Sequence, residues 1–235
     1  MIDTHCHLLP GLDDGPGSLG EAVSLARSLT ADGIQRVVCT PHYSPQFPTS
    51  HADAVAGLRA LRAELAGLGL ETALAAEVSP GYAVSAPLDE LRVRSLGGRF
   101  VVCEALADSQ PAFFESALAR LAEAALVPIF AHPERCRAVQ RRIGLVDWAR
   151  KRGALVQVVA PSLLGRWGGA TSATAWRLID TGRADLLASD AHGTRRRSVH
   201  LREAAALVTE RLGAAVAATL TERRPAELLD EAARA

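Results

Sequence analysis

The chain has 235 residues, of which 49% are apolar and 22% charged, so it can bury a sizeable core and is not a disordered chain. Its 26 basic residues balance its 26 acidic ones. A broad surface for nucleic acid or acidic membranes would show as a basic excess, so we expect no nucleic-acid partner. No stretch approaches the roughly 20 apolar residues of a membrane span, and the start MIDTHCHLLPG lacks a signal-peptide pattern. We therefore expect a cytoplasmic protein without membrane insertion.

Seven short apolar runs alternate along the chain with segments of helical periodicity. Most runs are continuously apolar, which is typical of parallel strands that are buried on both faces. We expect strands over residues 2–7, 36–40, 72–77, 100–105, 127–132, 155–160 and 186–190.

The segments between the runs carry helix signals. Ser18 and Glu21 form a capping box before a helical pattern, and Gly33, Gly153 and Gly182 each follow one. Residues 199–234 are expected to form terminal packing helices. Seven strand–helix repeats without a linker predict a single α/β domain over residues 1–235, a closed or distorted barrel. An open doubly wound sheet is the alternative.

Side chains that can bind metals stand at or just after the ends of these strands. In a parallel barrel all those ends meet at one face, so we expect the side chains to converge there. They are His5, His7, His42, Glu77, Glu104, His132, Asp190 and His192. A single histidine at a strand end is more often a hydrogen-bonded structural residue, but five of the seven histidines occupy these positions. Mixed histidine and carboxylate ligands suit zinc, manganese or iron.

The loop after the first run contains Asp13-Asp14-Gly15-Pro16. These residues are common in a plain turn before a helix. They can equally supply a further ligand that reaches back over the site, and the spacing alone leaves both interpretations open.

The segments DTHCHLLPGLDDGP, TPH, AAE, HPER and SDAH, in this order, resemble the PHP (polymerase and histidinol phosphatase) superfamily of metal-dependent phosphoesterases. The branch they resemble most is that of bacterial capsular-polysaccharide tyrosine-protein phosphatases, over roughly residues 1–200. The resemblance implies a distorted (β/α)7 barrel of the PHP type with two or three divalent ions, manganese, iron or zinc. It assigns His5, His7, Glu77 and Asp190 to one ion, Glu77, Glu104 and His132 to a second, and Asp14, His42 and His192 to a third.

The resemblance also implies roles for neighbouring residues. Arg135 in HPER and Arg197 after SDAH match phosphate-binding arginines, and with His42 and His192 they make up the expected catalytic set. Because Arg195, Arg196 and Arg197 are adjacent, any of them could serve, and a solvated basic loop is the other interpretation. Asp3 is expected to orient a histidine ligand.

The implied activity is hydrolysis of a phosphate monoester. The resemblance points to protein phosphotyrosine in the regulation of capsular or exopolysaccharide synthesis, with a bacterial tyrosine kinase tail as the substrate. Leu8-Leu9-Pro10-Gly11 after the HxH motif favours this branch over the histidinol-phosphatase and polymerase branches. A small phosphate ester such as histidinol phosphate is the alternative substrate. The oligomeric state stays open.

Two other functional classes were considered. The segment from Cys136 to Arg142 satisfies the bare C-x5-R pattern of cysteine-dependent phosphatases. Those enzymes need glycine in a loop whose backbone N–H groups face the anion, and no glycine stands between these two residues. A barrel that has lost its metals and only binds a partner is the second class, and the complete ligand set argues against it.

Overall fold

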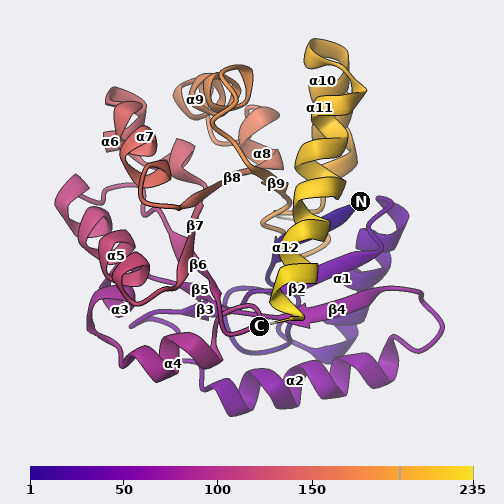
Figure 1. Ribbon diagram of the computed structural model, residues 1–235. Helices are drawn as coiled ribbons and strands as arrows, with labels where there is room; N and C mark the ends of the chain where they lie inside the picture. The colour runs from indigo at the N-terminus through magenta and orange to yellow at the C-terminus, as the bar shows by residue number, and fades with distance from the viewer. Residues whose placement is uncertain (196, 235) are drawn as a thin grey trace.

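The computed structural model describes residues 1–195 and 197–234, and its paired strands all run in parallel (Figure 1). One sheet holds, in spatial order, β1 (Ile2–Cys6), β2 (Arg36–Cys39) and β4 (Glu71–Leu74). The other holds β3 (His42–Tyr43), β5 (Glu77–Val78), β6 (Phe100–Glu104), β7 (Val127–Ala131), β8 (Leu155–Val159) and β9 (Leu186–Ala188). Arg196, one of the three adjacent arginines, lies outside the described residues.

The two sheets follow one cyclic order. The chain continues from β2 into β3 and from β4 into β5 after short breaks, and Pro41, which has no N–H, stands in the first break. The last strand returns to the first, because Cys6 bridges to Ala191 in parallel and the Asp190 N–H donates to the His5 carbonyl at 2.9 Å. The predicted mixed α/β fold with seven strand positions is confirmed, and its order is that of a distorted barrel. The expected strand 72–77 differs in being interrupted between β4 and β5.

Helices surround the strands in Figure 1. They are α1 (Leu19–Ala31), α2 (His51–Glu64), α3 (Pro80–Ser85), α4 (Leu88–Val93), α5 (Pro111–Glu123), α6 (Arg137–Arg141), α7 (Gly144–Arg150), α8 (Ala160–Leu163), α9 (Gly169–Asp180), α10 (Leu201–Leu212), α11 (Ala214–Ala218) and α12 (Arg224–Ala232). The first half of the predicted capping box is present, since the Ser18 side chain accepts the Glu21 N–H, whereas the Glu21 carboxylate accepts the N–H of Gly17 rather than that of Ser18. In the described part of the chain, none of these helices has both the length and the apolar character needed to span a bilayer.

Alternate residues of the strands face two apolar layers. Val101 and Cys103 of β6 belong to the layer that includes helix residues such as Leu118. Phe100 and Val102 belong to a smaller cluster with Leu228, which comes from α12. This smaller cluster begins at the amino ends of the strands and extends along them as far as Ala131, the last residue of β7, and α12 contributes Leu228, Leu229 and Ala232 to it.

An irregularity in β1 aims its histidines. The pairing of β1 with β2 shifts register between Asp3 and Cys6. In a regular strand Ile2 and Cys6 would share a face, but Ile2 lies in the smaller cluster and Cys6 in the outer layer. A bulge of this kind changes the direction in which the following side chains point.

Candidate metal centre

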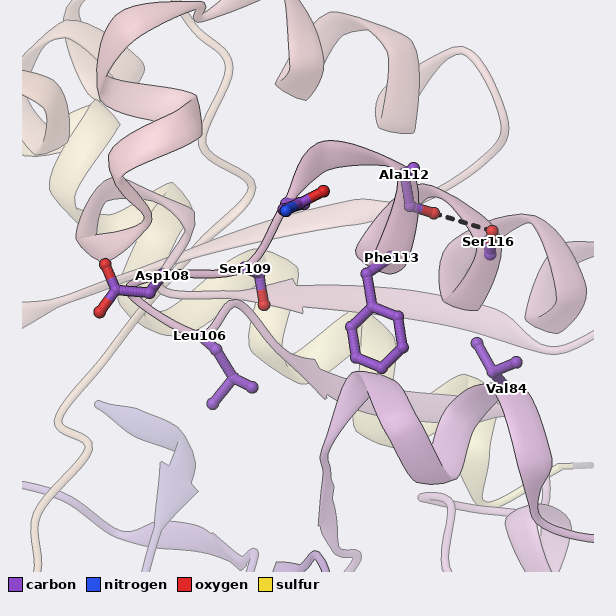
Figure 2. Close-up of a pocket in the computed structure, with 8 residues that line it drawn as sticks. Val84, Leu106, Asp108, Ser109, Ala112, Phe113 and Ser116 are labelled. Atoms are coloured by element: carbon purple, nitrogen blue, oxygen red, sulfur yellow. Dashed lines mark hydrogen bonds between the residues drawn. The ribbon is translucent and has the colours of Figure 1, made fainter.

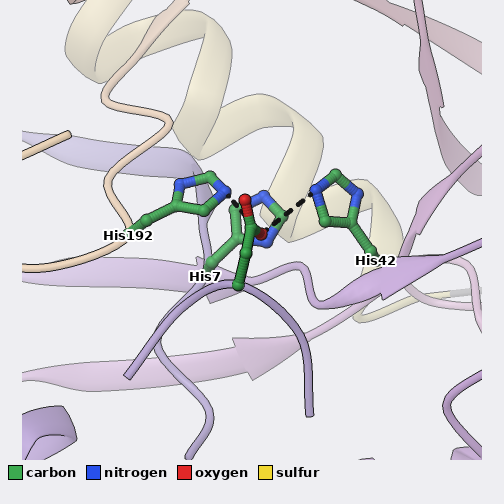
Figure 3. Close-up of side chains that lie close together, drawn as sticks. His7, His42 and His192 are labelled. Carbon is green, nitrogen blue, oxygen red and sulfur yellow. Dashed lines mark ion pairs between the residues drawn. The ribbon is translucent and has the colours of Figure 1, made fainter. Parts of the chain in front are cut away.

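The structure brings together all nine side chains proposed from the sequence as metal ligands. They lie at the carboxyl ends of the strands, and Figure 3 shows three of the imidazole rings turned toward one another. Within each of four overlapping groups, the donor atoms lie within 4.8 Å of one another. The groups are His7, Asp14, His42 and His192; His5, His132 and Asp190; His5, His7 and Glu77; and His42, Glu77 and Glu104.

The rings of His5 and His7 present lone pairs to each other. Nδ1 of His5 lies 2.7 Å from Oε1 of Gln157, and Nδ1 of His7 lies 2.6 Å from the Asp13 carboxylate. Because both partners are acceptors, the neutral rings carry their protons on Nδ1. Their Nε2 atoms then face each other as bare acceptors, only 3.3 Å apart.

Glu77 is shared between two of the groups. It follows the break before β5 and is 1% exposed. Its Oε1 accepts a hydrogen bond from His132 at 2.7 Å, while Oε2 lies 3.0 Å from Nδ1 of His42 and 3.3 Å from Nε2 of His7. One carboxylate thus contacts ligands from both sides, which is the geometry expected of a bridging group.

The structure distinguishes the two adjacent aspartates of the first loop. Asp14 Oδ1 lies 3.4 Å from Nε2 of His42 and 3.2 Å from Nε2 of His192, so it faces the cluster. Asp13 accepts from the His7 ring and from the N–H groups of Gly15 and His42. Asp14 therefore belongs to the cluster of metal-competent side chains, and Asp13 fixes a histidine and the loop.

Arg135 and Arg197 both reach the cluster. Arg135 donates to Asp190 at 3.1 Å, and its guanidinium lies over the Trp167 ring, 4.7 Å from the centroid. Arg197 donates to Asp14 at 2.9 Å and to Asp190 at 3.0 Å. Both line a cavity of about 450 Å³ together with His42 and Glu104, among other residues. Arg195 lines a separate neighbouring pocket.

Backbone strain concentrates at the ends of the strands. Four described residues other than glycine have a left-handed backbone, and three belong to the site: His132 with φ +36°, Asp190 with +52° and Arg197 with +52°. The fourth is Ala125. Such conformations are unfavourable for side chains with a Cβ and persist where the surroundings enforce them, often at functional sites.

The aromatic residues near the site have different positions. Phe47 lines the cavity and stacks on His42, with ring centroids 5.4 Å apart. Tyr43 is 9% exposed, donates to Glu90 and has the Arg94 guanidinium over its ring. Of these two rings, only Phe47 is placed to meet a substrate.

Two buried polar residues fill roles that the sequence did not resolve. Gln157 is the only polar residue of β8, and it orients the His5 ring. Asp3 accepts from the His5 backbone N–H and from the Ser189 hydroxyl and N–H, so it ties β1 to the end of β9 rather than orienting a ring. A lone amide inside an apolar strand was the signal that could have revealed Gln157.

The charges of the cluster shift the pKa values of its members. Although burial opposes protonation, Glu77 raises the pKa of His5 to about 9 and that of His42 to about 11. Burial and the nearby Glu77 raise the pKa of Glu104 to about 7. Without a cation, the carboxylates thus favour protonated histidines, and a bound cation would displace those protons and leave the neutral rings with bare Nε2 atoms.

The donor set fits divalent ions. Glu77 Oε2, His132 Nδ1 and His192 Nε2 are buried atoms without a hydrogen-bond partner in the described structure. The Nε2 atoms of His5 and His7, when the rings are neutral, add two more lone pairs that face each other. Hydrogen-bond acceptors therefore point at other acceptors in this cluster. A cation between these atoms relieves that arrangement, and imidazole with carboxylate is a set that zinc, iron and manganese accept.

Comparisons with known proteins show the family to which the chain belongs. A sequence model of the family described as "Capsular polysaccharide synthesis, CpsB/CapC" matches residues 1–230. Tyrosine-protein phosphatase YwqE of Bacillus subtilis is 29% identical over 97% of this chain and 91% of its own length. Tyrosine-protein phosphatase CpsB of Streptococcus pneumoniae is 23% identical over 97% of this chain and 98% of its own length.

Solved structures share the fold of this chain. A crystal structure from work on YwqE of Bacillus subtilis and CpsB of Streptococcus pneumoniae, described as unique metal-dependent tyrosine phosphatases, is 28% identical with a TM-score of 0.89, covering 98% of this chain and 94% of the other. An organophosphorus hydrolase from Deinococcus radiodurans has a TM-score of 0.61 at 16% identity, over 97% and 92% of the chains, which shows a shared fold alone.

Proposed function

The chain belongs to the CpsB/CapC family of capsular polysaccharide synthesis, and from this premise we propose that it is a metal-dependent protein-tyrosine phosphatase. The observation that carries the proposal is the convergence of nine metal-competent side chains with two arginines at one cavity. The relatives that match along the whole chain are tyrosine-protein phosphatases, and the related structure is described as metal-dependent.

We propose that two or three ions of manganese, iron or zinc occupy this site. His5, His7, Glu77 and Asp190 would hold one, Glu77, Glu104 and His132 a second, and Asp14, His42 and His192 a third. The overlapping groups support the first and third sets. In the second, His132 lies 2.7 Å from Glu77, but the groups join Glu104 with His42 and Glu77, and His132 with His5 and Asp190. The ligands span residues 5–192, so we propose that the chain acts as one catalytic domain.

The arginines supply the phosphate contacts. When bound, the ions supply Lewis-acid charge and a nucleophilic water at neutral pH. The guanidinium groups of Arg135 and Arg197 neutralise charge on the phosphoryl oxygens, and Trp167 supports the first of them from below. A tyrosine leaving group, with a pKa of about 10, departs without a strong general acid.

We propose a phosphotyrosine protein as the substrate, in the regulation of capsular or exopolysaccharide synthesis in the cytoplasm. A kinase that bears phosphotyrosines on a chain tail is the partner that the family relationship suggests. Phe47 beside His42 offers a ring on which the tyrosyl group can stack.

The cysteine-based alternative lacks its geometry. Cys136 is buried, and its thiol faces the Ser109 carbonyl at 3.8 Å. Arg142, the arginine of the C-x5-R pattern, is 67% exposed and lies 3.8 Å from Glu115 rather than beside the thiol. No common anion site joins the two residues.

The test is removal of metal. We expect a chelator to abolish hydrolysis of p-nitrophenyl phosphate and of a phosphotyrosine peptide, and Mn²⁺ to restore both. Elemental analysis of the purified protein identifies the ions. Full activity in the metal-free protein contradicts the proposal, and restoration of hydrolysis for histidinol phosphate but not for the peptide moves the substrate to the small-ester alternative.

A further inference from the structure

An apolar groove lies beside the catalytic cavity (Figure 2). Its volume is about 740 Å³, larger than the cavity that holds the arginines. The walls come from α3, from the loop after β6 and from the start of α5. Val84, Leu106 and Phe113 form its apolar surface, and Figure 2 shows them around one space.

These side chains are unusually exposed. Val84 is 36% exposed, Leu106 39% and Phe113 46%. They account for three of the seven large apolar side chains that reach this level of exposure in the described part of the chain. A clustered apolar patch on a protein surface marks a binding site more often than isolated exposed residues do.

The groove and the phosphate cavity are neighbours. Leu106 lines both, and it stands two residues after Glu104, which ends β6 in the cavity. A substrate chain whose phosphotyrosine enters the cavity can therefore extend along the groove. An extended chain advances about 3.3 Å per residue, so residues within about three positions of the phosphotyrosine can reach it.

A polar group in the groove also lacks a partner. The Ser109 hydroxyl is buried and makes no hydrogen bond within the described residues, and Figure 2 shows it between Leu106 and Phe113. Buried hydroxyls in proteins are normally hydrogen-bonded. Because this oxygen is itself shielded from solvent, a substrate in the groove would reach it only after a local shift of the loop. The charge of Asp108 at the rim is paired with Arg137 at 2.7 Å.

We propose that this groove binds an apolar side chain of the protein substrate, close in sequence to the phosphotyrosine, and so selects the site that is dephosphorylated. The inference rests on the proposed phosphatase function. The occupant is a substrate residue because the groove borders the substrate cavity at Leu106.

A peptide scan on the unaltered enzyme tests the proposal. Phosphotyrosine peptides of glycine and serine would carry one leucine at each of the positions within about three residues of the phosphotyrosine. We expect kcat/KM to rise on the order of tenfold for leucine at one or two neighbouring positions. An equal kcat/KM for every peptide overturns the proposal.

A matched pair of variants locates the effect. Val84→Asp places a charge in the groove, whereas Val93→Asp places one on α4, where the valine is 54% exposed and outside the groove. We expect Val84→Asp to remove the preference for leucine while hydrolysis of p-nitrophenyl phosphate stays unchanged, and Val93→Asp to change neither. Equal losses in the two variants overturn the proposal.

Two further results separate the explanations. If Val84→Asp fails a thermal-unfolding check, the peptide scan alone decides. A dimer in sedimentation that Val84→Asp dissociates overturns the proposal by assigning the groove to a second copy of the chain. If the metal-loaded enzyme hydrolyses neither p-nitrophenyl phosphate nor any peptide, the failure lies in the proposed function, whereas hydrolysis without a leucine preference rejects the groove alone.

Discussion

The two ends of the same strands are built in opposite ways. At the amino ends, Ile2 and Leu186, the first residues of β1 and β9, share a cluster of apolar side chains with Leu228 of α12. At the carboxyl ends, the strands terminate in imidazoles and carboxylates. In β7 the apolar cluster extends to the last strand residue, Ala131, and the next residue, His132, already belongs to the polar site.

This difference separates stability from chemistry along the barrel axis. Burial of apolar surface at the amino ends favours folding. The carboxyl ends gather ionisable groups away from water, and three site residues there hold a left-handed backbone, both of which oppose folding. Substitutions at the two ends should therefore fail in different ways.

The largest effect is expected for Glu77→Gln. The amide keeps the size of the side chain but removes the charge that faces the histidines from both sides. We expect kcat to fall about 1,000-fold, because the charge stabilisation that the bound ions supply is worth several kcal/mol. Kinetics with p-nitrophenyl phosphate measure the loss of kcat, and elemental analysis measures the loss of bound metal. Activity within tenfold of the unaltered enzyme would show that Glu77 is not a ligand.

The complementary change at the amino ends is Leu228→Ala. Leu228 is 4% exposed, so the variant should lower the free energy of unfolding by about 3 kcal/mol while the folded fraction keeps its kcat. Urea unfolding and kinetics at 25 °C measure both quantities. Leu88→Ala on α4, where the leucine is 37% exposed, is the matched control and should change stability by less than about 0.5 kcal/mol. Equal destabilisation by the two variants would contradict the role of the α12 cluster.

The sequence predicts the fold well because each strand is buried on both faces. Continuous apolar runs such as that of β6 and turn glycines such as Gly33, with φ +86°, are local signals. The breaks before β3 and β5 were not predicted. They depend on how the neighbouring strands pair, and no local pattern records that.

The site is predictable in its members and less so in its arrangement. Strand ends and the family resemblance identified all nine side chains that converge. The partner of the His5 ring is Gln157, 152 residues away, and the partner of Asp3 is Ser189 rather than a histidine ring. Such pairs form when the last strands close onto β1, so spacing along the chain does not reveal them.

The smallest expected effect concerns a buried carboxylate at the carboxyl ends. Glu134 is fully buried, and its Oε1 accepts the Val159 N–H at 3.0 Å. Burial raises its pKa from 4.5 to about 7. Because the folded pKa lies above the unfolded one, this group's contribution to stability is fully present below about pH 4.5 and is lost as the pH rises toward 7.

Glu134→Gln keeps an oxygen for Val159 and cannot ionise. As the pH rises from 5 to 7, the free energy of unfolding of the variant should therefore increase by roughly 2 kcal/mol relative to that of the unaltered protein. Urea unfolding of both proteins at the two pH values, with chelator present throughout, measures the gain. Glu210→Gln, which changes an exposed carboxylate on α10, is the control and should show no such gain. If the variant and the unaltered protein differ in stability by the same amount at pH 5 and pH 7, buried charge at this end of the strands does not oppose folding. The contrast between the two ends would then rest on packing alone.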